Sequence, residues 1–225
     1  LVRYRSQVIR RLASLAVDSK ILTSIEQGLE LFSMIHAEGH NRGHFYGPWP
    51  YGPDKECLMY EGLEECRACL VALRLVEHMG FSPDQCDAFA VHIFATRCFG
   101  YGFDAYKRKR QRRETVREIT VGLTLLQSLL TCSAIKIHPG VKLRVELDPR
   151  AIRSRLMQML GEIHQAEARA KPEGVGGLRA IARQWYPIAF PGARYSPEAM
   201  AVYGYLQRKE VKSREPETPG TLGRR

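Results

Sequence analysis

The chain has 225 residues, 44% hydrophobic and 26% charged, which predicts a globular domain with a substantial core and excludes wholesale disorder. Lys and Arg outnumber Asp and Glu by 34 to 24, a net charge of +10 that is typical of proteins that bind polyanions. Six cysteines are too sparse for a small disulfide scaffold, so we expect free thiols and a cytoplasmic or other reducing intracellular compartment. An organelle matrix is the alternative, because residues 1–17 are rich in arginine and lack acids. No apolar run reaches the roughly 20 residues of a membrane span, so we expect no membrane partner.

Apolar residues at helical spacing predict most of the chain's elements. The expected helices cover residues 3–17, 20–39, 54–79, a segment that begins at Ser82-Pro83-Asp84, then 113–132, 149–169, 177–185 and 196–209. Two segments that alternate apolar and basic residues, 135–137 and 141–145, predict a β-hairpin at about 134–147. The expected fold class is therefore mainly α, a helical bundle-like body with one small β-hairpin. We expect one domain over 1–212, with a candidate sub-boundary near 100–113, and a disordered basic tail at 213–225.

The strongest functional signal is a basic run at residues 107–113. Residues 97–117 hold eight basic side chains against Asp104 and Glu114, a net of +6. Like charges at this density need solvent or an anionic partner, and phosphate backbones are such a partner. The run consists of Lys107, Arg108, Lys109, Arg110, Arg112 and Arg113.

Aromatic and basic residues near this run extend the predicted nucleic-acid site. Glycines at 100 and 102 would free the backbone, so that Tyr101 and Phe103 could present their rings outward to stack on bases. Lys142 and Arg144 share the polar face of the predicted hairpin and would add phosphate contacts. The alternatives are a solvated helix start whose aromatic residues belong to the core, and an acidic protein partner.

Three histidines at a spacing of four form a second constellation. His36, His40 and His44 would lie on one face of a helix, where imidazoles can share a metal ion. Gly39 and Gly43 weaken that helix, however, and the first two histidines continue an apolar stripe. We therefore interpret them as core histidines with hydrogen-bond partners, with metal binding as the alternative.

Cys66 and Cys69 form a C-x-x-C motif in the middle of a predicted helix. Redox pairs of this type usually lie at a helix N-terminus, so we expect both cysteines to pack in the core, with zinc as the alternative.

Signatures of nucleophilic catalysis and of nucleotide-binding folds are absent from the sequence. The preferred interpretation is a non-catalytic, nucleic-acid-binding subunit of a larger (ribonucleo)protein assembly, with DNA or RNA and other protein subunits as partners and no cofactor. Two alternatives remain open: a helical metalloenzyme that uses the three histidines, and a structural subunit of a protein complex that binds no nucleic acid.

Overall fold

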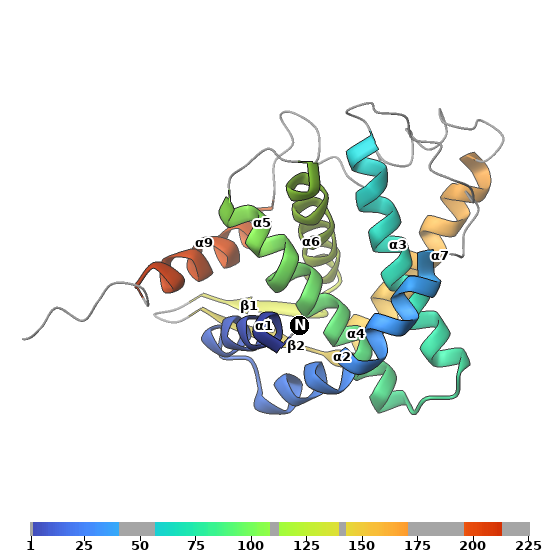
Figure 1. Ribbon diagram of the computed structural model, residues 1–225. Helices are drawn as coiled ribbons and strands as arrows, with labels where there is room; N and C mark the ends of the chain where they lie inside the picture. Colours follow the sequence, from blue (N-terminus) through green and yellow to red (C-terminus); the bar gives the residue numbers. More distant parts are fainter. Residues whose placement is uncertain (1, 41–56, 109–112, 140–142, 171–195, 213–225) are drawn as a thin grey trace, which may run out of the picture.

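The computed structural model describes residues 2–40, 57–108, 113–139, 143–170 and 196–212. As predicted, the fold is mainly helical with one two-stranded antiparallel hairpin (Figure 1). In chain order the elements are α1 (Val2–Ser14), α2 (Ser19–His40), α3 (Cys57–His78), α4 (Pro83–Ala95), the π-helical turn η1 (Thr96–Gly102), α5 (Phe103–Arg108), α6 (Arg113–Thr131), β1 (Ile135–His138), β2 (Arg144–Leu147), α7 (Pro149–Ala170) and α9 (Pro197–Lys212). None of the described helices is both long enough and apolar enough to cross a membrane.

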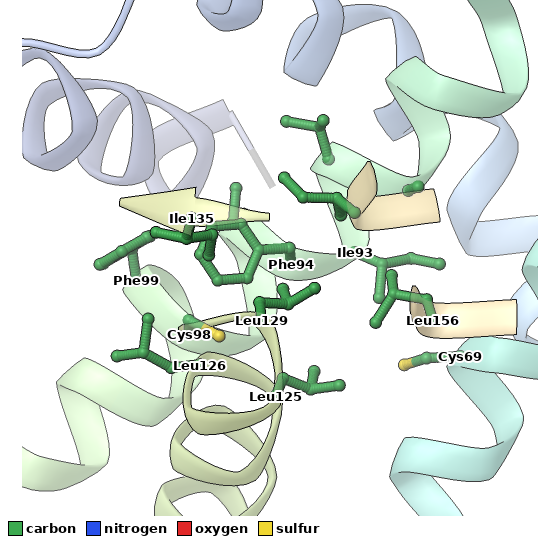
Figure 2. Close-up of a cluster of buried hydrophobic side chains, with 14 of the residues drawn as sticks. Cys69, Ile93, Phe94, Cys98, Phe99, Leu125, Leu126, Leu129, Ile135 and Leu156 are labelled. Carbon is green, nitrogen blue, oxygen red and sulfur yellow. The ribbon is translucent and has the colours of Figure 1, made fainter. Parts of the chain in front are cut away.

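The core is built around α4 and η1. Every residue from 88 to 100 is buried, and α2, α3, α6 and α7 all contact α4. Figure 2 shows how Phe94 and Phe99 from this central element meet Leu126 of α6 and Ile135 of β1. A helix that is apolar on all sides can be stable only when it is surrounded in this way.

Local signals in the sequence fix the start of α4 and the register of the hairpin. The Ser82 hydroxyl accepts a hydrogen bond from the Gln85 backbone, and the Gln85 side chain accepts one from the Ser82 backbone, which is a complete capping box. In the hairpin, Ile135 pairs with Leu147 and both are buried. The backbone N–H of Val145 donates to the Leu15 carbonyl at 2.9 Å, which joins the hairpin to the end of α1.

Gly39 lets α2 and α3 approach closely. A Cβ atom at this position would lie 2.2 Å from the carbonyl oxygen of Ala68, so no larger residue fits without moving one helix. Helix α2 continues through Gly39 to His40, one residue beyond the end expected from the sequence. The role of Gly39 is to bring His36 and His40 on α2 next to the acids of α3.

Candidate functional site

Three basic segments that are far apart in the sequence meet around one groove. The first helix, the end of α5 and the last described helix each contribute side chains to it, and it encloses about 540 Å³. Figure 1 shows α1, α5 and α9 gathered on one side of the molecule. We call this feature the basic groove; its lining residues are Gln7, Arg10, Arg11, Ser14, Lys107, Leu206, Lys209 and Glu210.

The floor of the basic groove is a network of paired charges. Arg11 is only 4% exposed, and its guanidinium contacts Asp104 at 2.5 Å and Glu210 at 2.8 Å. Lys107 contacts the same two acids, at 3.1 and 2.6 Å. Both cations also lie over the ring of Phe103, 4.8 and 5.1 Å from its centroid. These contacts hold the floor in place, while Arg10 and Lys209 line the same groove as exposed cations.

The described part of the predicted nucleic-acid site differs from expectation in its aromatic residues. Phe103 is completely buried, so the expectation that its ring faces outward is wrong. The ring packs against Tyr203, with their centroids 5.4 Å apart. Gly102 lies close to the same tyrosine, because a Cβ atom on this glycine would lie 2.9 Å from the Tyr203 hydroxyl oxygen. Tyr101 is 40% exposed, and its ring centroid lies 5.4 Å from the Arg97 guanidinium.

The predicted basic residues are described only in part. Lys107 is half-buried in the groove, and Arg144 is exposed on β2 opposite His138. Arg108 ends α5 and Arg113 begins α6, so the basic run connects these two helices. Lys109, Arg110, Arg112 and Lys142 lie outside the described residues.

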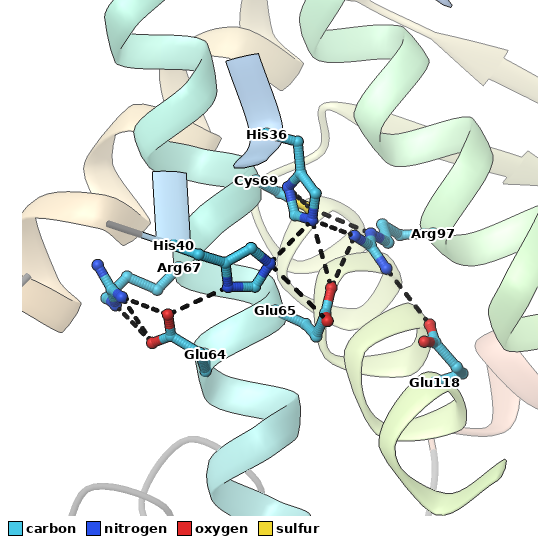
Figure 3. A network of polar contacts seen from close by, with 8 residues as sticks. All are labelled: His36, His40, Glu64, Glu65, Arg67, Cys69, Arg97 and Glu118. Carbon is cyan, nitrogen blue, oxygen red and sulfur yellow. Dashed lines mark hydrogen bonds and ion pairs between the residues drawn. The ribbon is translucent and has the colours of Figure 1, made fainter. Parts of the chain in front are cut away.

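A second group of polar side chains lies between α2, α3, η1 and α6 (Figure 3). We call it the histidine–glutamate cluster; it consists of His36, His40, Glu64, Glu65, Arg67, Cys69, Arg97 and Glu118. Its centre contains three potential metal ligands, His36, His40 and Glu65, all of them half-buried. In the described part of the chain, no other group of three or more such side chains converges in this way.

The three central side chains point toward one another. The Nε2 atoms of His36 and His40 lie 3.2 Å apart. Glu65 Oε2 is 3.5 Å from His36 Nε2, and Glu65 Oε1 is 3.9 Å from His40 Nε2. The spacing of four along α2 places both rings on one face, as the sequence predicted, and Glu65 reaches them from α3.

Each central side chain also contacts a neighbouring group of the cluster, and Arg97 Nη2 lies 3.1 Å from His36 Nε2. Glu64 Oε1 lies 3.2 Å from His40 Nδ1, and Arg67 contacts the same carboxylate at 2.5 Å. The Cys69 sulfur lies 3.7 Å from His36 Nδ1. Arg97 donates to Glu65 Oε2 at 2.9 Å, and it also contacts Glu118 at 3.4 Å.

These contacts shift the protonation of the cluster. Burial of the His36 ring favours its neutral form, but contacts with Cys69 and Glu65 outweigh burial and raise the pKa of His36 to about 9. Burial likewise favours neutral Glu64, yet hydrogen bonds from His40 and Arg67 outweigh it and lower the pKa of Glu64 below its ordinary value. Burial also opposes the charge of Arg97, but Cys69 and the carboxylates of Glu65 and Glu118 raise its pKa above the ordinary value.

The sequence identified part of this cluster and missed the rest. His36 and His40 are side by side with hydrogen-bond partners, as expected, but they are half-buried in a polar cluster and not in the core, while His44 lies outside the described residues. Glu65 and Arg97 were missed because they are distant in sequence from the histidines. One sequence feature could have indicated this part of the cluster: Glu64, Glu65 and Arg67 are charged residues within an otherwise apolar helical stripe.

The C-x-x-C motif packs in the core as predicted. Cys66 and Cys69 are fully buried, and neither forms a disulfide. The Cys69 sulfur accepts a hydrogen bond from Arg97 Nε at 3.1 Å, so this thiol also supports the cluster.

Comparison with known proteins gives no further assignment, since no family model and no curated protein matches the sequence.

Proposed function

We propose that the chain is a nucleic-acid-binding subunit that contacts phosphate groups through the basic groove. One observation carries this proposal: basic side chains from α1, α5 and α9, up to 199 residues apart in the sequence, line one groove. Arginine and lysine that neutralise phosphates release condensed counterions, and this release favours binding.

The charge distribution in the groove supports a phosphate ligand. Arg11, Lys107, Asp104 and Glu210 neutralise one another on the floor, which fixes the groove without leaving a strong charge there. Exposed Arg10 and Lys209 lie at the same groove, and the basic run continues from Lys107. A negatively charged backbone that crosses the groove would therefore meet cations on α1 and α9 close to Lys107, the first residue of the run.

The proposed contacts favour phosphate over bases. Phe103 cannot stack on a base while it is buried, and the exposed cations Arg10 and Lys209 are contacts for an anionic backbone. Phosphate contacts fix the position of a strand but do not read its sequence. We therefore expect binding of single strands with little sequence preference and with strong dependence on salt.

The test is strand binding as a function of salt concentration. The double variant Arg10→Gln, Lys209→Gln removes two exposed cations from the groove. The matched control, Arg74→Gln with Arg150→Gln, removes the same charge from exposed positions on α3 and α7. Affinity for a labelled single strand is measured by fluorescence anisotropy at several salt concentrations.

The slope of log K against log salt is negative, and each lost phosphate contact reduces its magnitude by about 0.7 for single strands, so the magnitude should be about 1.4 smaller in the groove variant. The control should keep the native slope. Absence of strand binding by the native chain, or an equal change in both variants, contradicts the proposal.

A further inference from the structure

We propose that His36, His40 and Glu65 bind one divalent metal ion of the zinc class. The two imidazole Nε2 atoms and one carboxylate oxygen of Glu65 are the ligands, and a fourth position remains for water or another small ligand. This site lies between α2 and α3 and does not depend on the basic groove.

The distances between the ligand atoms agree with tetrahedral coordination. Bonds of about 2.0–2.2 Å to nitrogen and oxygen place neighbouring ligand atoms of a tetrahedron about 3.3–3.6 Å apart. The two Nε2 atoms lie 3.2 Å apart, Glu65 Oε2 lies 3.5 Å from His36 Nε2, and Glu65 Oε1 lies 3.9 Å from His40 Nε2, so each oxygen of the carboxylate faces a different ring. A rotation of the Glu65 carboxylate would bring one oxygen toward both rings, because ligand atoms of all three side chains already lie within 4.8 Å of one another.

The orientation of His40 is the one a metal ligand requires. When Glu64 accepts a hydrogen from His40 Nδ1, the neutral ring keeps its Nε2 lone pair, which faces His36 and Glu65. Arg67 in turn fixes the Glu64 carboxylate. A carboxylate that orients a histidine from the outer side is a common feature of zinc sites.

The ligand Glu65 has the same kind of support. Its Oε2 atom accepts a hydrogen bond from Arg97 at 2.9 Å, and its Oε1 atom faces His40. Oε2 also faces His36, so an ion that is bound through Oε1, with the Arg97 hydrogen bond kept on Oε2, requires Oε1 to turn toward His36 as well. Cys69 lies on the Nδ1 side of His36, opposite the proposed ion, so it supports the ring and is not a ligand.

The charge of the surroundings favours a cation. Arg97 lies between Glu65 and Glu118, and Arg67 lies between Glu64 and Glu167, so carboxylates outnumber guanidiniums by two to one in these contacts. A divalent ion would offset this excess in a partly buried place where charges interact strongly. Arg97 Nη2 also lies 3.1 Å from His36 Nε2, so binding of the ion replaces this contact and releases the proton that His36 holds at neutral pH. The site is also open to entry from solvent, because the side chains of His36 and His40 are 16% and 35% exposed.

An ion of this class that is bound by three protein side chains has a fourth coordination position open to water. This arrangement is typical of catalytic zinc sites, whereas structural zinc sites have four protein ligands. The histidine–glutamate cluster would then supply a Lewis acid to a chain whose groove binds a different ligand.

The test is titration of the full, metal-stripped chain with Co(II), followed by visible absorption, with Zn(II) as competitor. We expect one Co(II) per chain, with the intense bands of a tetrahedral site that Zn(II) abolishes. Glu65→Gln and His40→Gln should each lose the bands, and Glu64→Gln should weaken binding by about 10–100-fold, the effect typical of an outer-shell carboxylate. The control His78→Gln changes an exposed histidine in the last turn of α3 and should bind as the native chain does.

Circular dichroism shows whether each variant remains helical. If a ligand variant unfolds, proton NMR of the native chain provides the test. Zn(II) should shift the imidazole ring-proton resonances of His36 and His40 and leave those of His78 and His138 unchanged. A native chain that takes up no stoichiometric Co(II) or Zn(II) overturns the proposal. So does metal binding that survives both ligand substitutions, or zinc that shifts other histidines instead.

Discussion

The basic groove and the histidine–glutamate cluster use the same kinds of side chain in opposite ways. In the groove, pairs such as Arg11 with Asp104 neutralise each other beneath exposed cations. In the cluster, each guanidinium contacts two carboxylates, and two imidazoles face each other at the centre. Exposed cations attract an extended anion and are screened by salt, whereas a partly buried acidic group attracts a compact cation and is screened much less.

The groove therefore depends mainly on surface charge, whereas the cluster depends on the fixed geometry of its side chains. The cations on the rim of the groove can be replaced with little effect on the fold, because surface substitutions rarely change stability by more than about 0.5 kcal/mol. The cluster depends on the close approach of α2 and α3, so its ligands and its packing cannot be changed independently.

The largest effect is expected for Phe103→Ala. The ring is completely buried against Tyr203 and supports Arg11 and Lys107 from below, so truncation should cost about 3–5 kcal/mol of unfolding free energy. Chemical denaturation measures the loss. If the variant instead remains stable but loses strand affinity, the result would contradict this prediction and indicate that the Phe103 ring stacks directly on a base.

The second-largest effect is expected for Gly39→Ala, which should affect the histidine–glutamate cluster but not the basic groove. The added methyl group would lie 2.2 Å from the Ala68 carbonyl oxygen, so α2 must move away from α3. We expect a loss of about 1–3 kcal/mol and weaker cobalt binding, while strand affinity at the groove stays unchanged. The control is Gly161→Ala in α7, where the new Cβ meets no atom within 4 Å; this variant should be as stable as the native chain or more stable. Equal behaviour of the two variants would contradict the packing role of Gly39.

The groove floor should be sensitive to acid through Glu210. Burial favours the neutral acid, but Lys107 and Arg11 outweigh it and lower the pKa of Glu210 below its ordinary value of 4.5. The stabilisation is therefore present above that ordinary value and is lost as the pH falls through the lower folded-state pKa.

Glu210→Gln should accordingly cost about 1 kcal/mol at neutral pH, a modest figure because the carboxylate is partly exposed and screened. The stabilities of the native chain and the variant should converge in acid. Denaturation curves at several pH values check this, and a difference that persists unchanged to low pH would assign the effect to packing.

The smallest effect is expected for Tyr101→Ala. The ring is 40% exposed and contacts the Arg97 guanidinium, an interaction worth about 0.5 kcal/mol at an exposed position. Melting temperature should change little, and strand affinity should change little if phosphate contacts dominate. A large loss of affinity in a stable variant would show that this ring stacks on a base.

Much of the fold was predictable because its signals are local. The capping box at Ser82, the apolar spacing of α6 and the alternation in β1 and β2 each depend on a few neighbouring residues. The spacing of His36 and His40 on one helical face is a signal of the same kind.

The remaining features depend on contacts between distant segments. Burial of Phe103 and the tight packing of Gly102 depend on α6 and α9, which no local pattern reveals. The pairing of Glu65 with the histidines likewise depends on how α2 packs on α3. In the groove, α1 and α9 meet through Arg11 and Glu210, a contact that links opposite ends of the sequence.

The most direct test measures the salt dependence of strand binding side by side in two proteins, the Arg10→Gln, Lys209→Gln variant and the Glu65→Gln variant. The proposed function and the proposed metal site are independent, so the magnitude of the negative slope of log K against log salt should fall by about 1.4 in the groove variant and stay native in the cluster variant. An unchanged slope in the groove variant, or an equal fall in both proteins, would contradict the assignment of strand binding to the basic groove.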